Sequence, residues 1–473
     1  MKMCKIFLLL TLPLLIFNAC MLGPKYKKPV YDLPQNTAPD EDYYISFRPN
    51  WWKMFKDENL NKIIHEALIY NTDLIAATAR LDYARANYIS ARAGRMPALT
   101  ASVNPAKADS NTPYITGTSE AALSASFELD LFGKYRALSK SAYANWLSSK
   151  AAREQVRLTL IGQVAKAYFK MLSLDLQLKI AQYTLKSREE DYKIYKIRFE
   201  NGYINKVDLK RVEAEMYSVS TQVENTTLSL LQAQTNLQVL LGKSPKEIVE
   251  GPLIESKNID DIFVVPTVPE NIPSTLLKRR PDIIKAEQAL IAANAQISAA
   301  RAAYFPDISL TGMGGFASEP LHHLFETNSS FWQISGQGVL NIFQGGKIIA
   351  QNKMAGARYR EMLASYQNTV QLAFKDALDS LNANRLYRKI YTETKQQTEA
   401  LKETYQLTKM QQDAGLINTT DLLLVEQNLL SAEMRLVQAR QAELEAVVSL
   451  AVAVGGGFEE DKFLHPKKHK NRD

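Results

Sequence analysis

The sequence predicts a mainly α-helical, internally duplicated chain that carries four β-strands, two in each half. Three observations lead to this prediction. A glycine turn followed by a long helix with a heptad pattern occurs at residues 201–241 and again at residues 414–453. In each half, a segment with a period of two follows a proline that ends a helix. The 473 residues include only 20 glycines and 18 prolines, so the helices must be long and the loops few.

The first part of the chain has the features of a lipoprotein signal peptide. Residues 1–19 begin with a basic segment and continue with an apolar run from Ile6 to Phe17, which is too short for a permanent membrane helix. The run ends at Cys20 behind a small residue, so we expect a palmitate-type lipid on Cys20. A free Cys20 behind a plain secretory signal is the alternative. The other cysteine, Cys4, lies within the signal, so no disulfide is expected in the mature chain.

The rest of the chain divides into an arm, two repeats, a connector and a tail. Residues 20–58 are rich in proline and tyrosine and should form an extended N-terminal arm. The repeats are residues 59–241 and 281–454, and a proline-rich connector at 242–280 joins them. Residues 455–473 form a basic tail, which we interpret as a solvated end. The net charge of +7 is otherwise spread along the chain and is weak evidence for nucleic acid.

Each repeat opens with a helix, predicted at about residues 59–93 in the first repeat, that stops at a proline, Pro97 or Pro306, and continues as a β-hairpin. The hairpins are expected at about 98–131 and 307–343, because apolar and polar residues alternate there. Four such strands cannot close a barrel alone, and an open edge in a membrane would leave backbone groups unpaired. We therefore expect other copies of the chain to pair with the edges. A soluble sheet with one solvated face is the alternative that the pattern leaves open.

Two long helices follow the hairpins. Residues 134–199 and 347–412 contain no proline, which predicts helices about 100 Å long. The seam of the second is more polar, a difference that facing a water-filled space would produce.

A glycine turn ends each long helix. Gly202 and Gly415 are expected to adopt positive φ. The next helices are predicted to begin at asparagine N-caps, Asn205 and Asn418. Aspartates three positions later are predicted to complete capping boxes, namely Asp208 and Asp421.

Several short motifs occur in a fixed order along the chain. They are the segment from Cys20 to Pro29, Trp51-Trp52-Lys53-Met54-Phe55, Asn71-Thr72-Asp73-Leu74, Arg279-Arg280-Pro281-Asp282, Tyr304-Phe305-Pro306 and the two glycine turns. This set resembles the TolC-like outer-membrane efflux channels, specifically their lipoprotein branch, over nearly the whole mature chain. The resemblance implies a homotrimer whose twelve strands, four from each of three copies, form one outer-membrane β-barrel. A long α-helical barrel would continue it through the periplasm.

The resemblance also implies partners and cargo. A periplasmic adaptor protein and an inner-membrane pump would dock to the channel, which would serve as a passive exit duct for drugs, metal ions or other small toxic compounds. The motif from Arg279 to Asp282 is most simply a helix start, to which the resemblance adds a structural role at the equator. We assign the same structural role to Pro97 and Pro306.

For the two turns, the resemblance implies a gate. Three copies would meet at the periplasmic end and surround the pore with carboxylates, which repel one another and attract cations. Asp421 matches an acidic gate position of the family, Leu424 stands where many relatives have a second acid, and Asp208 is the corresponding acid of the first repeat. Capping alone would also explain the aspartates. Exposed turn residues are candidate adaptor contacts, namely Gly202, Tyr203, Gly415 and Leu416.

No motif indicates catalysis, a cofactor or a metal site. The sequence contains no phosphate-binding loop, no nucleophile elbow and no clustered set of histidine and cysteine. His322-His323 is interpreted as a surface pair in an external loop. The alternative to a channel is a lipid-anchored trimeric coiled-coil spacer or surface binding protein without conductance. The mirrored strand hairpins favour the channel, because a spacer does not need them.

Overall fold

The computed structural model describes residues 22–30, 50–105, 118–251, 259, 280–319, 321–456 and 458. The predictions for the signal peptide, Cys20, Arg279, most of the connector and nearly all of the basic tail lie outside these residues. In chain order the elements are η1 (Trp51–Phe55), α3 (Glu58–Tyr70), α4 (Thr72–Ala93), β1 (Ala98–Asn104), β2 (Ser119–Leu129), α5 (Lys134–Glu200), α6 (Lys206–Leu240), α7 (Pro245–Glu250), α8 (Pro281–Ala302), β3 (Asp307–Ser318), η4 (Leu321–His323), η5 (Thr327–Ser329), β4 (Ser330–Val339), α9 (Lys347–Asp413) and α10 (Thr419–Ala453).

The chain divides into two compact units. The first comprises residues 1–31, 79–151 and 284–369, and the second comprises residues 32–78, 152–283 and 370–473. None of the described helices combines the length and the apolar character that crossing a membrane requires.

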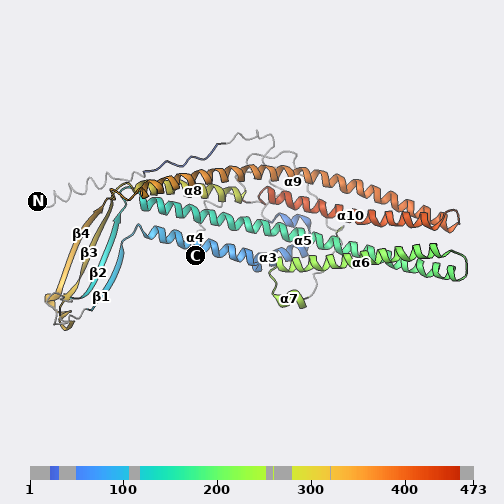
Figure 1. Cartoon of the computed structure of the whole chain (residues 1–473), viewed down its shortest axis with the longest axis horizontal. Coiled ribbons are helices and arrows are strands. Elements are labelled where there is room, and N and C mark those ends of the chain that lie inside the picture. The colour runs from blue at the N-terminus through green and yellow to red at the C-terminus, as the bar shows by residue number, and fades with distance from the viewer. Residues whose placement is uncertain are drawn as a thin grey trace, which may run out of the picture. The chain divides into compact units, whose positions relative to one another are not determined.

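The first unit contains one antiparallel sheet of four strands in the order β1-β2-β3-β4 (Figure 1). The hairpins of the two repeats are joined through β2 and β3, which pair from Ser119↔Ser318 to Leu129↔Ile308. Within the described residues, the outer edges of β1 and β4 have no partner strand. β4 ends at Val339, short of residue 343, because its partner β3 begins only at Asp307, directly after Pro306.

The register collects apolar side chains on one face of the sheet. Leu123 pairs with Gly314, which pairs with Trp332, and paired residues lie on the same face. The opposite face is polar, as shown by the row of Ser126, Thr311 and Ser335. The apolar face remains exposed in the single chain through side chains that include Leu99, Val103, Leu123, Leu310, Trp332 and Ile334. The predicted alternation is therefore confirmed across all four strands.

Ionic and capping contacts join the sheet to the helices that follow it. The Lys134 ammonium at the start of α5 lies 2.7 Å from an Asp307 carboxylate oxygen at the start of β3. Asp130, just after β2, accepts hydrogen bonds from the backbone N–H groups of Tyr135 and Arg136. The two hydrogen bonds to Asp130 satisfy backbone N–H groups of the first turn of α5, which have no partners within the helix.

The N-terminal segment 22–30 lies along α8. The Lys28 ammonium is 2.6 Å from a Glu287 carboxylate oxygen, and the Tyr26 hydroxyl donates to the other oxygen at 3.2 Å. The Asn294 amide donates to the Pro24 carbonyl at 2.9 Å. A Cβ on Gly23 would lie 1.8 Å from Ser298 Oγ, so only glycine allows this close approach.

The second unit contains the main apolar core. Trp51, Trp52 and Phe55 of η1 pack against α5, which contributes the fully buried Tyr168 and Phe169. The Tyr168 hydroxyl donates to the Asp57 carboxylate at 2.9 Å, while the other oxygen of that carboxylate caps α3. Aromatic residues of the arm are thus a structural part of this core.

The first predicted helix is two helices. The pattern predicts an unbroken helix from residue 59 to residue 93, but α3 ends at Tyr70 and α4 begins at Thr72. Asn71 between them is buried and extended, its side chain caps α4, and its amide donates to the Leu240 carbonyl at 2.9 Å. This contact with α6 decides the break and is not visible in the local periodicity.

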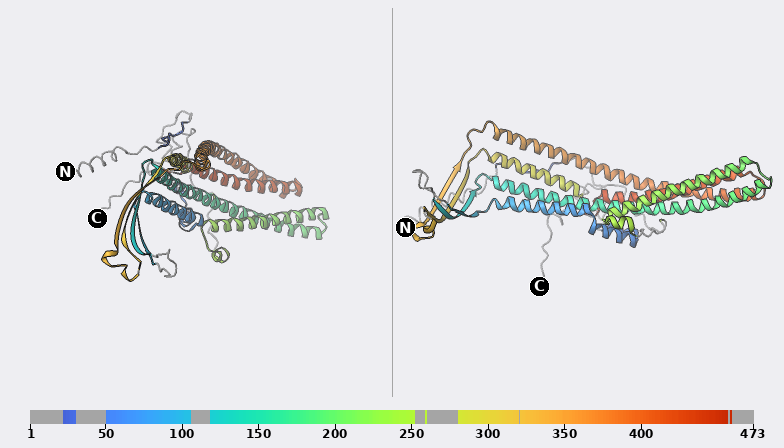
Figure 2. Two further views of the ribbon diagram at one scale, coloured as in Figure 1. Left: turned by 60° about the vertical axis from the view of Figure 1, so that its left-hand side comes forward. Right: turned by 60° about the horizontal axis from the view of Figure 1, so that its bottom comes forward.

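The duplication is confirmed by the helix lengths. α5 and α9 both contain 67 residues, and α6 and α10 both contain 35. Figures 1 and 2 show α6 returning alongside α5 and α10 returning alongside α9, so that each repeat provides one long helical hairpin.

Candidate gate at the helical tips

Each helical hairpin ends in a glycine turn with the same hydrogen bonds. Gly202 has a φ of 76° and Gly415 a φ of 72°, as predicted. The Tyr203 N–H donates to the Arg198 carbonyl and the Leu416 N–H to the Gln411 carbonyl, each at 2.9 Å, in the pattern of a Schellman cap. No atom lies within 4 Å of a Cβ built on either glycine, so the positive φ alone requires glycine here.

Asparagine caps start the returning helices. The Asn205 side chain accepts from the Asp208 N–H at 2.9 Å, and the Asn418 side chain accepts from the Asp421 N–H at 3.0 Å, which confirms both predicted N-caps. The capping boxes are only half formed, because no hydrogen bond returns from either aspartate side chain among the described contacts. The two carboxylates therefore lie near the positive helix ends without being tied to the caps.

Solvent exposure distinguishes the candidate gate residues. Asp421 is exposed and Asp208 is half-buried, and Leu424, three positions after Asp421, is 58% exposed. Tyr203 is 81% and Leu416 is 75% exposed. The second turn thus presents a carboxylate and a leucine on neighbouring positions of one helix face.

Near the turns, the two hairpins contact each other. The Gln412 amide of α9 donates to the Tyr195 hydroxyl of α5 at 3.3 Å, and the Arg211 guanidinium of α6 donates to the Thr420 hydroxyl of α10. A small apolar cluster accompanies these bonds and consists of Tyr195, Leu209, Val212 and Leu423.

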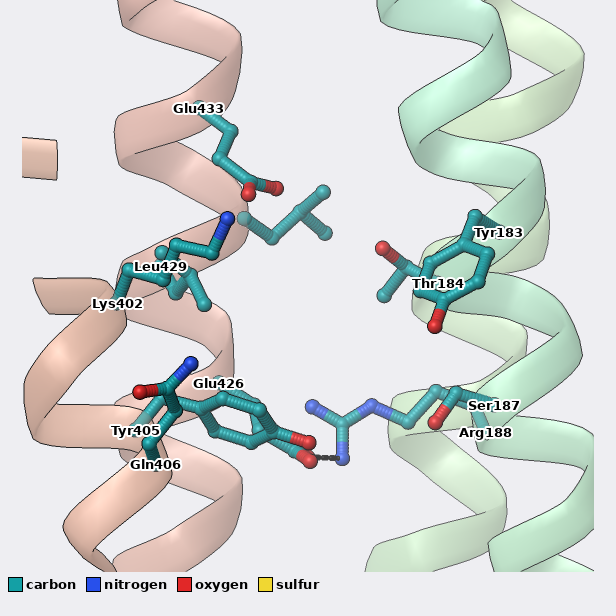
Figure 3. A pocket seen from close by; sticks show the side chains of 11 residues that line it. Tyr183, Thr184, Ser187, Arg188, Lys402, Tyr405, Gln406, Glu426, Leu429 and Glu433 are labelled. Atoms are coloured by element: carbon teal, nitrogen blue, oxygen red, sulfur yellow. Dashed lines mark ion pairs between the residues drawn. The ribbon is translucent and has the colours of Figure 1, made fainter. Parts of the chain in front are cut away.

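Further along the same helices, a cavity of about 320 Å³, lined by both polar and apolar side chains, lies between the hairpins. Figure 3 shows Arg188 of α5 reaching across it to Glu426 of α10, with which it forms an ion pair. The side chains are only 3% and 14% exposed. Tyr405 and Lys402 of α9 also line the cavity.

Burial perturbs the carboxylates around this cavity. Burial raises the pKa of Glu426, and the nearby Arg188 charge only partly opposes the rise. Burial likewise raises the pKa of Asp191 and of Glu433. The ionised carboxylates thus lose more hydration than their cationic neighbours replace.

The sequence pattern did not single out Arg188 or Glu426 as functional residues. A signal was nevertheless present, because Arg188 occupies the heptad position between Leu185 and Tyr192, where the apolar seam of α5 is interrupted. Its partner on α10 follows only from the packing of the two hairpins.

The predicted structural residues have contacts of their own. Pro281 is the first residue of α8, and Pro97 and Pro306 directly precede β1 and β3. Arg280 is buried, pairs with Asp282 at 2.7 Å and donates to the Ala453 carbonyl at 2.9 Å, so it also caps the C-terminus of α10. Among the described residues, no group of histidine, cysteine and acidic side chains is placed to hold a metal ion.

Comparison with known proteins gives one consistent result. The family model described as outer membrane efflux protein matches residues 63–243 and 272–456. The cation efflux system protein CusC of Escherichia coli K12 is 30% identical over 450 residues, which cover 94% of this chain and 97% of CusC. The probable outer membrane lipoprotein SilC of Salmonella typhimurium is 30% identical over 474 residues, covering 97% of this chain and all of SilC (100%).

A solved structure has the same fold. The outer membrane channel CmeC of Campylobacter jejuni superposes with a TM-score of 0.87 at 28% identity, covering 93% of this chain and 96% of CmeC. Sequence and structure therefore agree over nearly the full length of the chain.

Proposed function

Because the chain belongs to the outer membrane efflux protein family, we propose that it forms, as a homotrimer, the passive exit duct of a tripartite efflux system. We further propose that the helical tips are the periplasmic gate of this duct. The observation that supports the duct best is the sheet, which has one apolar face and two edges that no strand of the described residues pairs with.

The sheet suits assembly with other copies. If β4 of one copy pairs with β1 of the next, three copies place four strands each in a closed ring of twelve, and every edge is paired. The face that carries Leu123, Trp332 and Ile334 then turns toward lipid, and the polar face lines the interior.

The second turn suits a gate. Three copies of Asp421 and Leu424 around one axis would combine a ring of carboxylates, which attracts cations, with an apolar constriction. Asp208 is half-buried and would contribute less to the negative electrostatic potential of this carboxylate ring.

The exposed tips suit protein partners. Tyr203 and Leu416 are large apolar side chains at the ends of the hairpins, and a periplasmic adaptor protein would bury them. An inner-membrane pump would supply the energy for transport. The cargo class, whether drugs, metal ions or other small toxic compounds, would be selected by that pump, since a wide water-filled duct has little substrate chemistry in its wall.

The anchor is proposed to be a lipid on Cys20. The signal pattern and the similarity to SilC, which is named a probable outer membrane lipoprotein, support this assignment. Mass spectrometry of the N-terminal peptide tests it, and an unmodified Cys20 thiol would contradict it.

Conductance in planar bilayers tests the gate. We expect Asp421→Ala combined with Leu424→Ala to raise single-channel conductance and to lower cation selectivity. Glu399→Ala removes an exposed acid elsewhere on α9 and is the matched control. Unchanged conductance and selectivity in the double variant would remove the gate assignment. A purified trimer that conducts nothing would instead favour a lipid-anchored spacer.

A further inference from the structure

The cavity between the two helical hairpins contains a carboxylate that forms no ion pair with a cation of the described residues. We infer that this cavity binds a small organic cation, whose ammonium group pairs with Glu433 and whose apolar body lies against Tyr183 and Leu429. The inference adds a ligand to the proposed duct. It concerns binding between helices of one copy, so it can be tested whether or not the duct conducts.

The cavity has the size and the lining of a site for a small molecule. Its volume of about 320 Å³ lies within the range of ligand pockets, at the lower end. The lining side chains come from α5, α9 and α10, and all of them belong to the second compact unit of one chain. Leu429 and Leu430 offer apolar surface and Tyr183 and Tyr405 offer aromatic rings. Such a lining can hold the body of a ligand, while a few charged groups orient it.

Glu433 of α10 is the charged group that is left without a partner. Its side chain is half-buried and forms no hydrogen bond or ion pair with another described residue. Figure 3 shows its carboxylate pointing into the cavity, toward the side of α5 that carries Tyr183 and Thr184. Burial raises the pKa of Glu433, and the charge of Lys402 opposes the rise only in part. An ammonium group in the cavity would supply the charge-assisted hydrogen bond that this carboxylate lacks.

The other charges of this region favour a cation over an anion. Arg188 and Glu426 already pair with each other. Burial also raises the pKa of Glu426 and of Asp191, although the charge of Arg188 opposes the rise in both. The carboxylates therefore lose more hydration than the cations around them replace. A further positive charge relieves this deficit, whereas a further negative charge adds to it.

The spacing of the carboxylates favours an organic cation over a metal ion. Glu426 and Glu433 are seven positions apart on α10, which is about 10.5 Å along a helix. Because a divalent metal ion holds its oxygen ligands at about 2.0–2.6 Å, the two carboxylates are too far apart to share one. No group of metal-ligating side chains occurs in the described part of the chain. An organic ammonium ion needs only one carboxylate and also gains from packing against tyrosine rings.

Phenylbutylamine is a suitable test ligand, because it carries an ammonium group at one end of its chain and a phenyl ring at the other. Phenylbutanol is its neutral counterpart, and phenylbutyrate is its anionic counterpart. For a molecule of this size we expect a dissociation constant on the order of 1 mM. Comparison of the three ligands separates the contribution of the charge from that of the apolar body.

The experiment is isothermal titration calorimetry on the full-length trimer in nanodiscs, with empty nanodiscs as the background. Glu433→Gln removes the charge at nearly constant size, Lys402→Met removes the cation that competes for it, and Tyr183→Ala removes an exposed ring. Glu399→Gln is the matched control, because Glu399 is an exposed acid of α9 that does not line the cavity. Circular dichroism and native gels identify any variant that fails to fold or to form trimers.

We expect one phenylbutylamine to bind per copy, with phenylbutanol binding about tenfold more weakly. Glu433→Gln should weaken the binding of phenylbutylamine by about tenfold or more for the same reason. Lys402→Met should strengthen it, Tyr183→Ala should weaken it, and the control should match the wild type. A site that recognises only apolar surface would not respond in opposite directions to the removal of Glu433 and of Lys402.

Four results would overturn the inference. They are the absence of saturable binding, equal affinities for phenylbutylamine and phenylbutanol, tighter binding of phenylbutyrate, and an unchanged affinity in Glu433→Gln. Thermal unfolding gives a second readout, since a ligand that binds the folded state raises the unfolding midpoint. Phenylbutylamine should raise the midpoint of the wild type and of the control but not that of Glu433→Gln. An equal rise in all three would mean that the amine binds elsewhere. A trimer that binds the amine but conducts nothing would refute the proposed duct and leave the binding site standing.

Discussion

Ile334→Arg places a charge on the apolar face of the sheet and tests whether that face contacts lipid. Ile334 is 76% exposed in the single chain, lies on β4 and pairs with Gly312 of β3. It is the fifth of the ten residues of β4. At about 3.4 Å per residue it lies about 14 Å from one end of the strand and about 17 Å from the other. A lipid-facing side chain at this position would be near the middle of the bilayer.

The expected cost follows from that depth. An arginine on the lipid face at the midplane of an outer-membrane barrel costs about 2–4 kcal/mol per strand position. Three copies in a trimer would lose about 6–12 kcal/mol together, by the same estimate. Gln333→Arg is the matched control, because Gln333 is the neighbouring residue on the polar face and pairs with Met313. A charge that faces a water-filled interior should cost about 1 kcal/mol or less.

The assay is refolding of both variants into lipid vesicles across a urea series, together with the amount of trimer recovered from outer membranes. We expect Ile334→Arg to shift the unfolding midpoint to much lower urea and to deplete the membrane-inserted trimer, while Gln333→Arg stays close to the wild type. Equal losses for the two variants would refute the assignment of the apolar face to lipid. Normal insertion of Ile334→Arg would refute it as well.

Two further predictions concern the helical part of the chain. Gly242→Ala should destabilise the protein by more than the roughly 1–3 kcal/mol of a strained φ, because Gly242 has a φ of 72° and a Cβ there would lie 2.2 Å from the Tyr70 carbonyl oxygen. Calorimetry against Gly202→Ala, where φ is 76° and the space is open, separates steric overlap from backbone strain. Asn418→Ala should weaken the start of α10 by about 1 kcal/mol, visible as faster amide hydrogen exchange around Asp421.

Equal losses of stability in Gly242→Ala and Gly202→Ala would contradict the first of these predictions. Unchanged amide exchange near Asp421 in Asn418→Ala would contradict the second.

The elements that the sequence predicted best are those with a local cause. The heptad pattern and the glycine turn with its asparagine cap depend on residues only a few positions apart, so the amino-acid sequence alone predicts both hairpin turns. The apolar and polar faces of the sheet follow from the alternation of apolar and polar residues along each strand, which is also a local pattern. The register of the strands then places the apolar residues of all four on the same face. The short motifs that occur in a fixed order along the chain then indicated the family.

Only the tertiary structure decided the features that depend on residues far apart in the chain. The break at Asn71 depends on a carbonyl of α6, and the cap that Arg280 provides for the C-terminus of α10 joins residues far apart in the chain. The ion pair of Arg188 and Glu426 joins two helices from different repeats. Burial of Glu426 in this packing raises the pKa of its carboxyl group. The sequence by itself determined the repeats, the turns and the faces, because those follow from local periodicity and capping. Which charges meet across the hairpins depends on long-range packing, and for that reason only the folded chain specifies it.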